Sequence, residues 1–117
     1  KLESLNVIFD QVGTPTYAGD LAKVIIFIVR SNTFSQTDFK TQIYHFSNEG
    51  VCSWYDFAKT IFELTNTQCQ VSSIETKDYP TPGTRPHYSV LNKSKIKQSY
   101  NLVIPYWKDS LKQCLDK

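Results

Sequence analysis

The sequence predicts an α/β fold in which short strands are mixed with about four helices. Two observations support this. Apolar residues alternate with other residues in short stretches such as 5–9, but recur every three to four residues in longer stretches such as 54–65. Stretches of the two kinds also follow one another along the chain, which favours α/β over a segregated α+β arrangement. The 117 residues suit one domain, or one lobe of a larger fold.

In the first third of the chain, the alternation at 5–9 predicts a strand, which ends before Gly13. A helix is predicted over 17–31, with Asp20 in its first turn, where a carboxylate suits the helix dipole. Its centre, 24–29, is apolar all round, and its β-branched residues leave a strand as a competing possibility. Such a helix needs cover on more than one face. The sequence therefore hints at a partner outside this small chain.

The rest of the chain also alternates between short extended stretches and helices. A helix is expected from about Trp54 to Thr65, because Ser53 and Asp56 have N-cap spacing and an apolar face follows. The other predicted segments are a polar loop at 32–42, strands at 43–46 and 71–75, a proline-rich loop at 79–86, an extended stretch at 88–91, a helix at 93–100 capped by Asn92, and a last helix at 106–115 after Pro105.

Composition narrows the possible function classes. Hydrophobic residues make up 40% of the chain, enough for a modest core, and the formal net charge is only +2. Nothing in that charge favours nucleic acid or an anionic membrane as a partner, and no apolar run could span a bilayer. The three cysteines lack metal-ligand spacing, and the chain begins without a signal-peptide pattern. We therefore expect reduced thiols, no metal and a cytoplasmic location.

No set of residues predicts catalysis or cofactor binding. The four glycines are scattered and form neither a dinucleotide-binding loop nor a P-loop. Tyr55 and Lys59 have the Tyr-x-x-x-Lys spacing of short-chain reductases. They lie on the predicted amphipathic helix, however, without a glycine-rich loop in the chain. We interpret that match as accidental.

The best candidate for a binding site is the loop at 79–86. Its three prolines stiffen the backbone and present Arg85 between Tyr79 and Tyr88. A guanidinium suits bidentate binding of phosphate, and aromatic rings can stack on a base or a sugar. The alternative to a binding site is a purely structural loop whose arginine is solvated.

A second candidate is the predicted strand-to-helix turn at 10–17. Ligands of α/β folds gather where strands end, and Gln11, Thr14 and Thr16 offer amide and hydroxyl groups suited to a sugar. Ordinary turn and N-cap chemistry would explain the same residues. Trp54 opens the next predicted helix, where it either anchors the core or lines the same pocket.

Four groups of segments follow one another across nearly the whole chain: 10–17 with 20–22, 43–47 with 50–58, 79–82 with 85–91, and 104–111. In this order, they together resemble the dTDP-4-dehydrorhamnose reductase family of extended short-chain dehydrogenases/reductases.

The resemblance implies a C-terminal, substrate-binding lobe of a Rossmann-type enzyme over residues 1–117, with the N-terminal Rossmann domain absent. In the family, that domain binds NADPH or NADH and supplies the catalytic Tyr and Lys. The complete enzyme reduces dTDP-6-deoxy-L-lyxo-4-hexulose to dTDP-L-rhamnose, a precursor of bacterial surface polysaccharide. These 117 residues alone are then expected to hold no cofactor and to have no reductase activity.

The resemblance also suggests roles for five residues in binding a dTDP-sugar. Arg85 is expected at the diphosphate. Gln11 and Thr16 are expected to shape the sugar pocket, and Tyr79 and Trp54 to line it. None of the five is a catalytic acid or base.

Two other readings stay open. The chain could come from a non-catalytic relative, such as a regulatory subunit of methionine adenosyltransferase, or be a stand-alone α/β interaction module. The sequence also leaves open which nucleotide sugar binds, which cofactor the complete enzyme prefers, and whether a homodimer covers the helix at 17–31.

Overall fold

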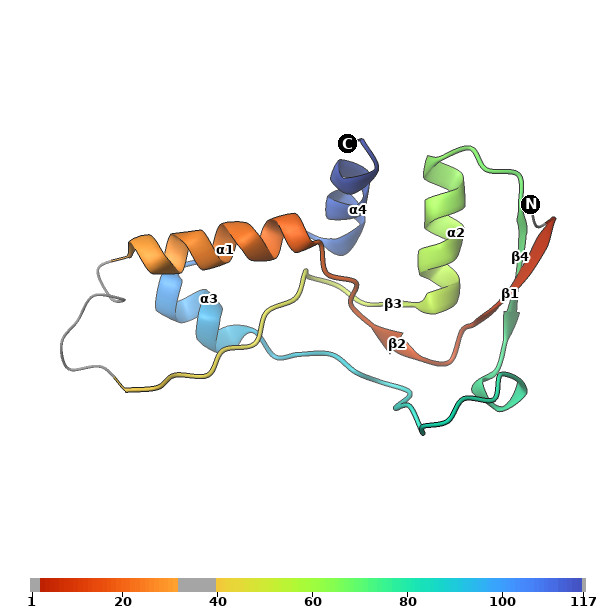
Figure 1. Ribbon diagram of the computed structural model, residues 1–117, viewed down its shortest axis with the longest axis horizontal. Coiled ribbons are helices and arrows are strands. Elements are labelled where there is room, and N and C mark those ends of the chain that lie inside the picture. Colours follow the sequence, from red (N-terminus) through yellow and green to blue (C-terminus); the bar gives the residue numbers. More distant parts are fainter. Residues whose placement is uncertain (1–2, 32–39, 117) are drawn as a thin grey trace.

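The computed structural model describes residues 3–31 and 40–116, and it confirms the α/β class with four α-helices among short strands (Figure 1). The elements, in chain order, are β1 (Ser4–Ile8), β2 (Val12–Gly13), α1 (Ala18–Arg30), β3 (Cys52–Ser53), α2 (Trp54–Leu64), β4 (Gln70–Ile74), the 3₁₀ turn η1 (Thr76–Asp78), α3 (Ser94–Tyr100) and α4 (Trp107–Leu115).

The strands form two small sheets. β1 pairs with β4 in parallel, in a register that places Ser4 opposite Gln70 and Ile8 opposite Ile74. A parallel pair needs a long crossover, and α2 lies within that connection and contacts both strands. β2 pairs antiparallel with β3. The strands predicted near 5–9 and 71–75 are therefore present, each within a residue of its expected bounds.

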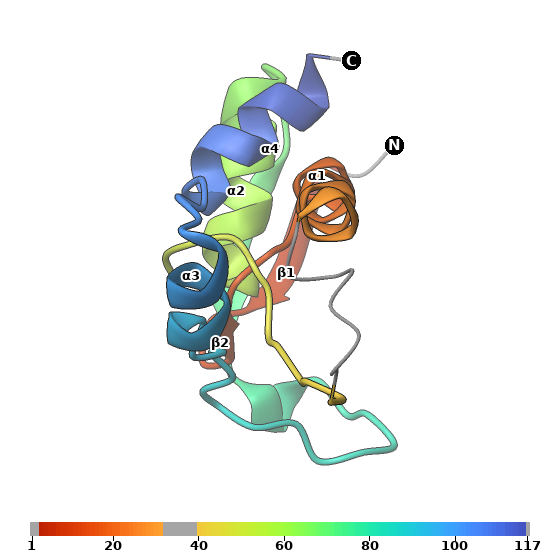
Figure 2. The ribbon, with the colours of Figure 1, turned by 90° about the vertical axis from the view of Figure 1, so that its left-hand side faces the viewer.

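The core lies between α2 and α4, which pack side by side (Figure 2). The α2 N-terminus has the capping box that the sequence predicts, because Ser53 Oγ accepts the Asp56 N–H and the Asp56 carboxylate accepts the Ser53 N–H. The core side chains come from β3 and both helices; they are Cys52, Trp107 and Leu111, with Phe57, Ile61 and Leu64 packed against them.

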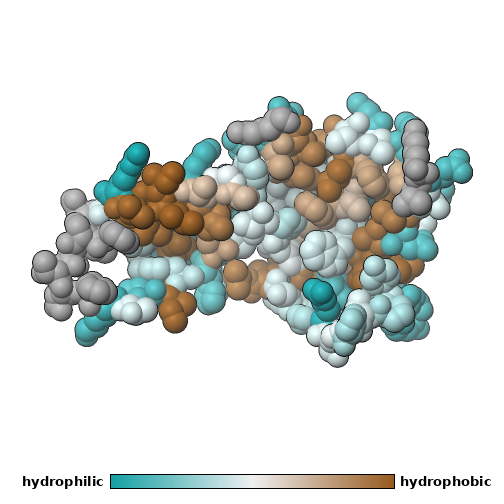
Figure 3. Space-filling view, viewed as in Figure 1, coloured by the Kyte–Doolittle hydropathy of each residue, from teal (hydrophilic) through white to brown (hydrophobic). Residues whose placement is uncertain are grey.

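The opposite end of the molecule holds α1 and α3 and has little core. The chain has a radius of gyration of 17.6 Å and a longest dimension of 57 Å, whereas a compact domain of this length would have a radius of gyration of about 13 Å. Five apolar side chains of α1 are 39–52% exposed, namely Leu21, Ile25, Ile26, Phe27 and Val29. Figure 3 shows a brown patch over α1. α1 is thus the expected helix, without the expected cover. Among the described residues, no helix has both the length and the apolar content to cross a bilayer.

The strand predicted at 43–46 is wrong for this structure, since these residues have no strand conformation. A strand exists only where a neighbouring backbone completes its hydrogen bonds, and neither of the two small sheets of the described residues reaches this segment. Ile43 is 72% exposed. The loop predicted at 32–42 lies mostly outside the described residues.

α3 and α4 match the helices predicted at 93–100 and 106–115. Lys93 is the residue at the N-cap position of α3, but the Asn92 side chain accepts the Ser94 N–H at 2.9 Å, so Asn92 still satisfies one amide of the first turn. α3 ends at Asn101, which has φ 55° in the left-handed region.

Asn48 joins three parts of the chain in one buried polar network. Its side chain is fully buried; Oδ1 accepts the Tyr17 N–H at 2.8 Å, and Nδ2 donates to Asp20 Oδ2 at 2.7 Å, to Pro105 O and to Ser110 Oγ. Ser110 also donates to Asp20. This network fixes where α1 begins, and with it the end of the turn that leads out of β2.

Candidate functional site

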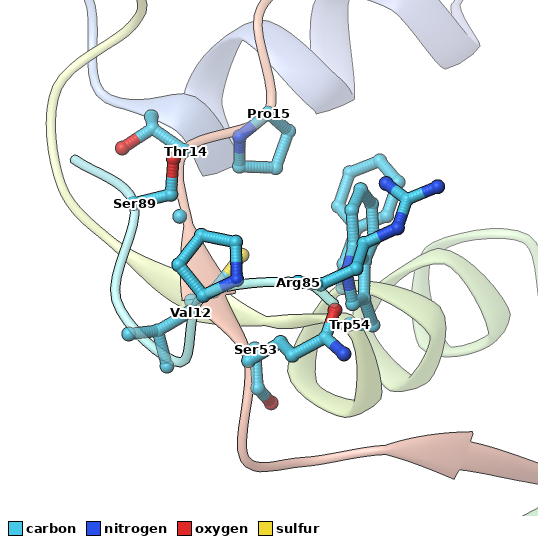
Figure 4. Close-up of a pocket in the computed structure, with 12 residues that line it drawn as sticks. Val12, Thr14, Pro15, Ser53, Trp54, Arg85 and Ser89 are labelled. Carbon is cyan, nitrogen blue, oxygen red and sulfur yellow. The ribbon is translucent and has the colours of Figure 1, made fainter. Parts of the chain in front are cut away.

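A hollow of about 250 Å³ lies between β2, the start of α2 and the chain at 85–89 (Figure 4). It is lined by Gln11, Val12, Gly13, Thr14, Pro15, Cys52, Ser53, Trp54, Phe57, Arg85, Pro86 and Ser89. A second hollow adjoins it and is lined in part by Gln11, Trp54, Tyr79 and Arg85. The fold therefore brings together four of the five predicted site residues. Thr16 is exposed and lines neither hollow.

The backbone of β2 holds the end of the proline-rich loop in place. The Val12 N–H donates to His87 O at 2.7 Å, and the Ser89 N–H donates to Val12 O at 2.8 Å. Gly13 allows this close approach, because a Cβ there would lie 2.9 Å from Ser89 O. Tyr88 forms an isolated parallel β-bridge with Val12, as expected from the extended stretch predicted at 88–91.

The other end of the loop is tied to the end of β1. The Thr76 N–H and hydroxyl both donate to Asp10 Oδ1, at 2.9 and 2.5 Å. The Thr76 hydroxyl, followed by its backbone N–H, lowers the pKa of Asp10 below its usual value. His87 Nδ1 lies 2.7 Å from Asp10 O, so it donates to that carbonyl. The loop that carries Tyr79 and Arg85 is thus anchored at both ends.

Arg85 reaches the rim of the hollow with its guanidinium free. Its side chain forms no ion pair or hydrogen bond with other described residues, and it borders three neighbouring hollows. In Figure 4, Arg85 and Trp54 lie on one side of the hollow, and Thr14 and Ser89 lie on the other. An unpaired guanidinium at the edge of a concave surface is suited to an anion, and phosphate fits its fork of donors best.

Aromatic and polar groups complete the lining. Trp54 is 52% exposed and Tyr79 53% exposed, so both rings present apolar surface to solvent where a ligand ring could stack. Ser53 is engaged in the α2 capping box, and the Thr14 hydroxyl donates to Gly50 O. The sequence indicated that the Thr14 hydroxyl could bind a sugar, but in the structure its proton is already used in this hydrogen bond.

Gln11 is the buried polar residue of the hollow, only 7% exposed, and its Nε2 donates to Thr76 Oγ1 at 3.3 Å. Sequence reasoning selected Gln11 but missed the contact between Asp10 and Thr76, and Thr76 also bonds Gln11. Asp10 and Thr76 are 66 positions apart, and only the parallel pairing of β1 with β4 brings them together. No local sequence signal could have found that contact.

The groups around the hollow are suited to binding rather than to covalent chemistry. Burial, followed by the nearby Asp56 carboxylate, raises the pKa of the Cys52 thiol to about 11, so the thiol stays protonated near neutral pH and is a poor nucleophile. Tyr55 and Lys59 line neither hollow. In the part of the chain that the structure describes, no group of three His, Cys, Asp or Glu residues could hold a metal ion.

Comparison with known families matches residues 1–117 to one family, described as the RmlD substrate binding domain. The chain is 42% identical over 115 residues to the dTDP-4-dehydrorhamnose reductase of Aggregatibacter actinomycetemcomitans, and the match covers 92% of this chain and 38% of that protein.

Two solved structures extend this likeness to the fold. The dTDP-4-dehydrorhamnose reductase of Clostridium acetobutylicum has a TM-score of 0.87 at 36% identity, over 98% of this chain and 39% of that one. The Bacillus anthracis protein of that name, solved in complex with NADP, has a TM-score of 0.79 at 32% identity, over 97% of this chain and 37% of that one. The chain thus spans somewhat under two fifths of the length of these relatives. Because the family match extends over its whole length, the chain belongs to the RmlD substrate-binding domain family.

Proposed function

We propose that this chain is the substrate-binding part of a dTDP-4-dehydrorhamnose reductase, and that it holds the nucleotide sugar in the hollow between β2, α2 and the proline-rich loop. The observation that carries the proposal is the free guanidinium of Arg85 beside Trp54 and Gln11. Arg85 binds the diphosphate, Trp54 and Tyr79 offer stacking surfaces, and Gln11 contacts the sugar. Thr16 keeps its predicted role only if a ligand extends beyond the lined surface.

The complete enzyme would reduce the 4-keto group of dTDP-6-deoxy-L-lyxo-4-hexulose with NADPH or NADH. The cofactor supplies the hydride, but the residues of this chain do not fit a dinucleotide. Dinucleotide-binding domains hold the pyrophosphate at a glycine-rich turn that opens a helix, and the four glycines of this chain are scattered and form no such turn. The role of this chain is therefore to bind and orient the sugar nucleotide, and alone it is inactive as a reductase.

The proposal is tested by replacing Arg85 with glutamine. The chain has two arginines, so Arg30→Gln, at the exposed end of α1, is a matched control. Isothermal titration with dTDP should show that Arg85→Gln weakens binding at least about tenfold, because a charge-assisted hydrogen bond to an anion contributes about 1.5–3 kcal/mol. Arg30→Gln should leave the affinity unchanged.

Titration with UDP and GDP distinguishes the competing readings. Tighter binding of either nucleotide than of dTDP would contradict the assigned substrate. If the chain does not bind dTDP even at millimolar concentration, the binding role itself is contradicted. That result would favour a non-catalytic relative or an interaction module.

We also propose that α1 and the segment at 40–46 form a docking surface for the remaining part of the complete reductase. α1 exposes apolar side chains on several faces. The segment at 43–46 has a strand-like sequence but pairs with no strand among the residues that the structure describes. In α/β folds, helices pack on a sheet and extended segments pair with its edge. Here α1 and the segment at 43–46 lack such a sheet among the described residues, as expected if the sheet belongs to another domain.

A charge substitution tests this surface. Ile25→Lys/Val29→Lys places two charges one helical turn apart on α1. Val51→Lys/Val103→Lys is a control pair at exposed valines that belong neither to α1 nor to the segment at 40–46. Each chain is mixed with the part of the Aggregatibacter relative that lies outside the matched region, and complex formation is followed by sedimentation velocity. The α1 pair should weaken the complex at least about tenfold, since two half-buried aliphatic side chains lose contact. If the chain instead forms a homodimer, and Ile25→Lys/Val29→Lys dissociates it, the surface binds a second copy of the chain.

A further inference from the structure

Asp10, Thr76 and Gln11 form a hydrogen-bond chain whose direction is fixed by chemistry. The Asp10 carboxylate, its pKa lowered by Thr76, can only accept near neutral pH. Thr76 has a single hydroxyl proton, and that proton goes to Asp10 Oδ1. The Thr76 oxygen must then accept from Gln11, and of the two ends of the Gln11 amide only Nε2 can donate.

The other end of that amide is Oε1, and Gln11 belongs to the lining of both hollows of the site. No hydrogen bond within the described residues uses Gln11 Oε1. Among those residues, the one side-chain nitrogen or oxygen that is both unbonded and closed off from solvent is Trp107 Nε1. Gln11 Oε1 is unbonded but is not closed off, although Gln11 as a whole is 93% buried, as follows from its 7% exposure. Gln11 lines two adjoining hollows together with Trp54 and Arg85, and these are the openings beside its side chain.

We propose that Asp10 and Thr76 are positioning residues that hold the Gln11 amide with its oxygen toward the ligand, so that the site selects a sugar hydroxyl donor at this point. The proposal rests on the nucleotide-sugar function above and adds a specificity determinant to it. A buried acceptor that finds no donor loses affinity, so Gln11 discriminates against ligands without a hydroxyl there. Arg85 recognises the diphosphate that all nucleoside diphosphates share, whereas Gln11 responds to the sugar.

The test compares two probes, dTDP and dTDP-L-rhamnose, by isothermal titration on the 117-residue chain. The quantity of interest is the ratio of their dissociation constants, which isolates the sugar contribution. Thr76→Val keeps the branched shape but loses the hydroxyl, and it should lower the preference for dTDP-L-rhamnose about three- to tenfold with dTDP affinity unchanged. Thr76→Ser should restore the preference.

A double-mutant cycle shows whether Thr76 acts through Gln11. Gln11→Leu should lower the preference by the same factor, and Thr76→Val in that background should lower it no further. Additive losses, or an equal loss of affinity for both probes in Thr76→Val, would overturn the inference, since either result means that Thr76 only anchors the loop. Equal affinities of the unsubstituted chain for dTDP and dTDP-L-rhamnose would also overturn the inference about Gln11. That result would leave the proposed role of Arg85 intact. Absence of dTDP binding would instead refute the proposed function.

Discussion

Replacing Asn48 with alanine should lower the free energy of unfolding by about 2–4 kcal/mol, because a buried polar group left without its hydrogen-bond partner costs about 1–3 kcal/mol. The Asn48 side chain is fully buried and makes four hydrogen bonds, one of them to the buried Asp20 carboxylate. Alanine leaves the Tyr17 N–H without its acceptor and removes a donor from Asp20. Urea unfolding followed by circular dichroism measures the loss.

Asn92→Ala is the matched control for that experiment. Asn92 is exposed and its side chain accepts a single N–H at the start of α3, so its removal should cost only about 0.5–1 kcal/mol. Asn48→Asp should destabilise at least as much as Asn48→Ala, because it places a second carboxylate against Asp20. Equal unfolding midpoints for Asn48→Ala and Asn92→Ala would show that the network is not what fixes α1.

Gly50→Ala should destabilise the chain by about 2–4 kcal/mol, combining backbone strain and overpacking. Gly50 has φ +87°, a conformation that costs any L-residue, and an added Cβ would lie 2.3 Å from Cε1 of Tyr106 and 3.0 Å from Cδ1 of Trp107. The Tyr106 ring is half exposed and can turn aside, but the buried Trp107 cannot move without disturbing the core.

The same substitution should also weaken dTDP binding, because Gly50 O accepts the hydroxyl of Thr14 at the wall of the hollow. Gly83→Ala is the control, since a Cβ at Gly83 meets nothing within 4 Å. Thermal unfolding of both variants, with and without dTDP, separates the two effects. A Gly50→Ala chain as stable as Gly83→Ala would contradict the strain argument.

Local sequence patterns determined most of the elements of this protein. The alternation at 5–9 predicts β1, the apolar face at 54–65 predicts α2, and Asn92 and Pro105 mark the starts of α3 and α4. The Ser53–Asp56 spacing gave the capping box of α2. These features depend on residues within one or two turns of each other, so the information is contained in short stretches. The ordered family segments, which also select Gln11, Trp54, Tyr79 and Arg85, can likewise be identified without a fold.

The tertiary structure alone decided features that depend on distant partners. The segment at 43–46 has the composition of a strand, but neither sheet of residues 3–31 and 40–116 includes it, so its sequence could not determine its conformation. Thr76 reaches Asp10 across 66 residues because β1 and β4 pair in parallel, and that contact in turn sets the direction of the Gln11 amide. The sequence by itself determined which residues are candidates for the binding site. Only the packing of distant segments decided how their side chains are held, because hydrogen-bond direction depends on the neighbours that folding supplies.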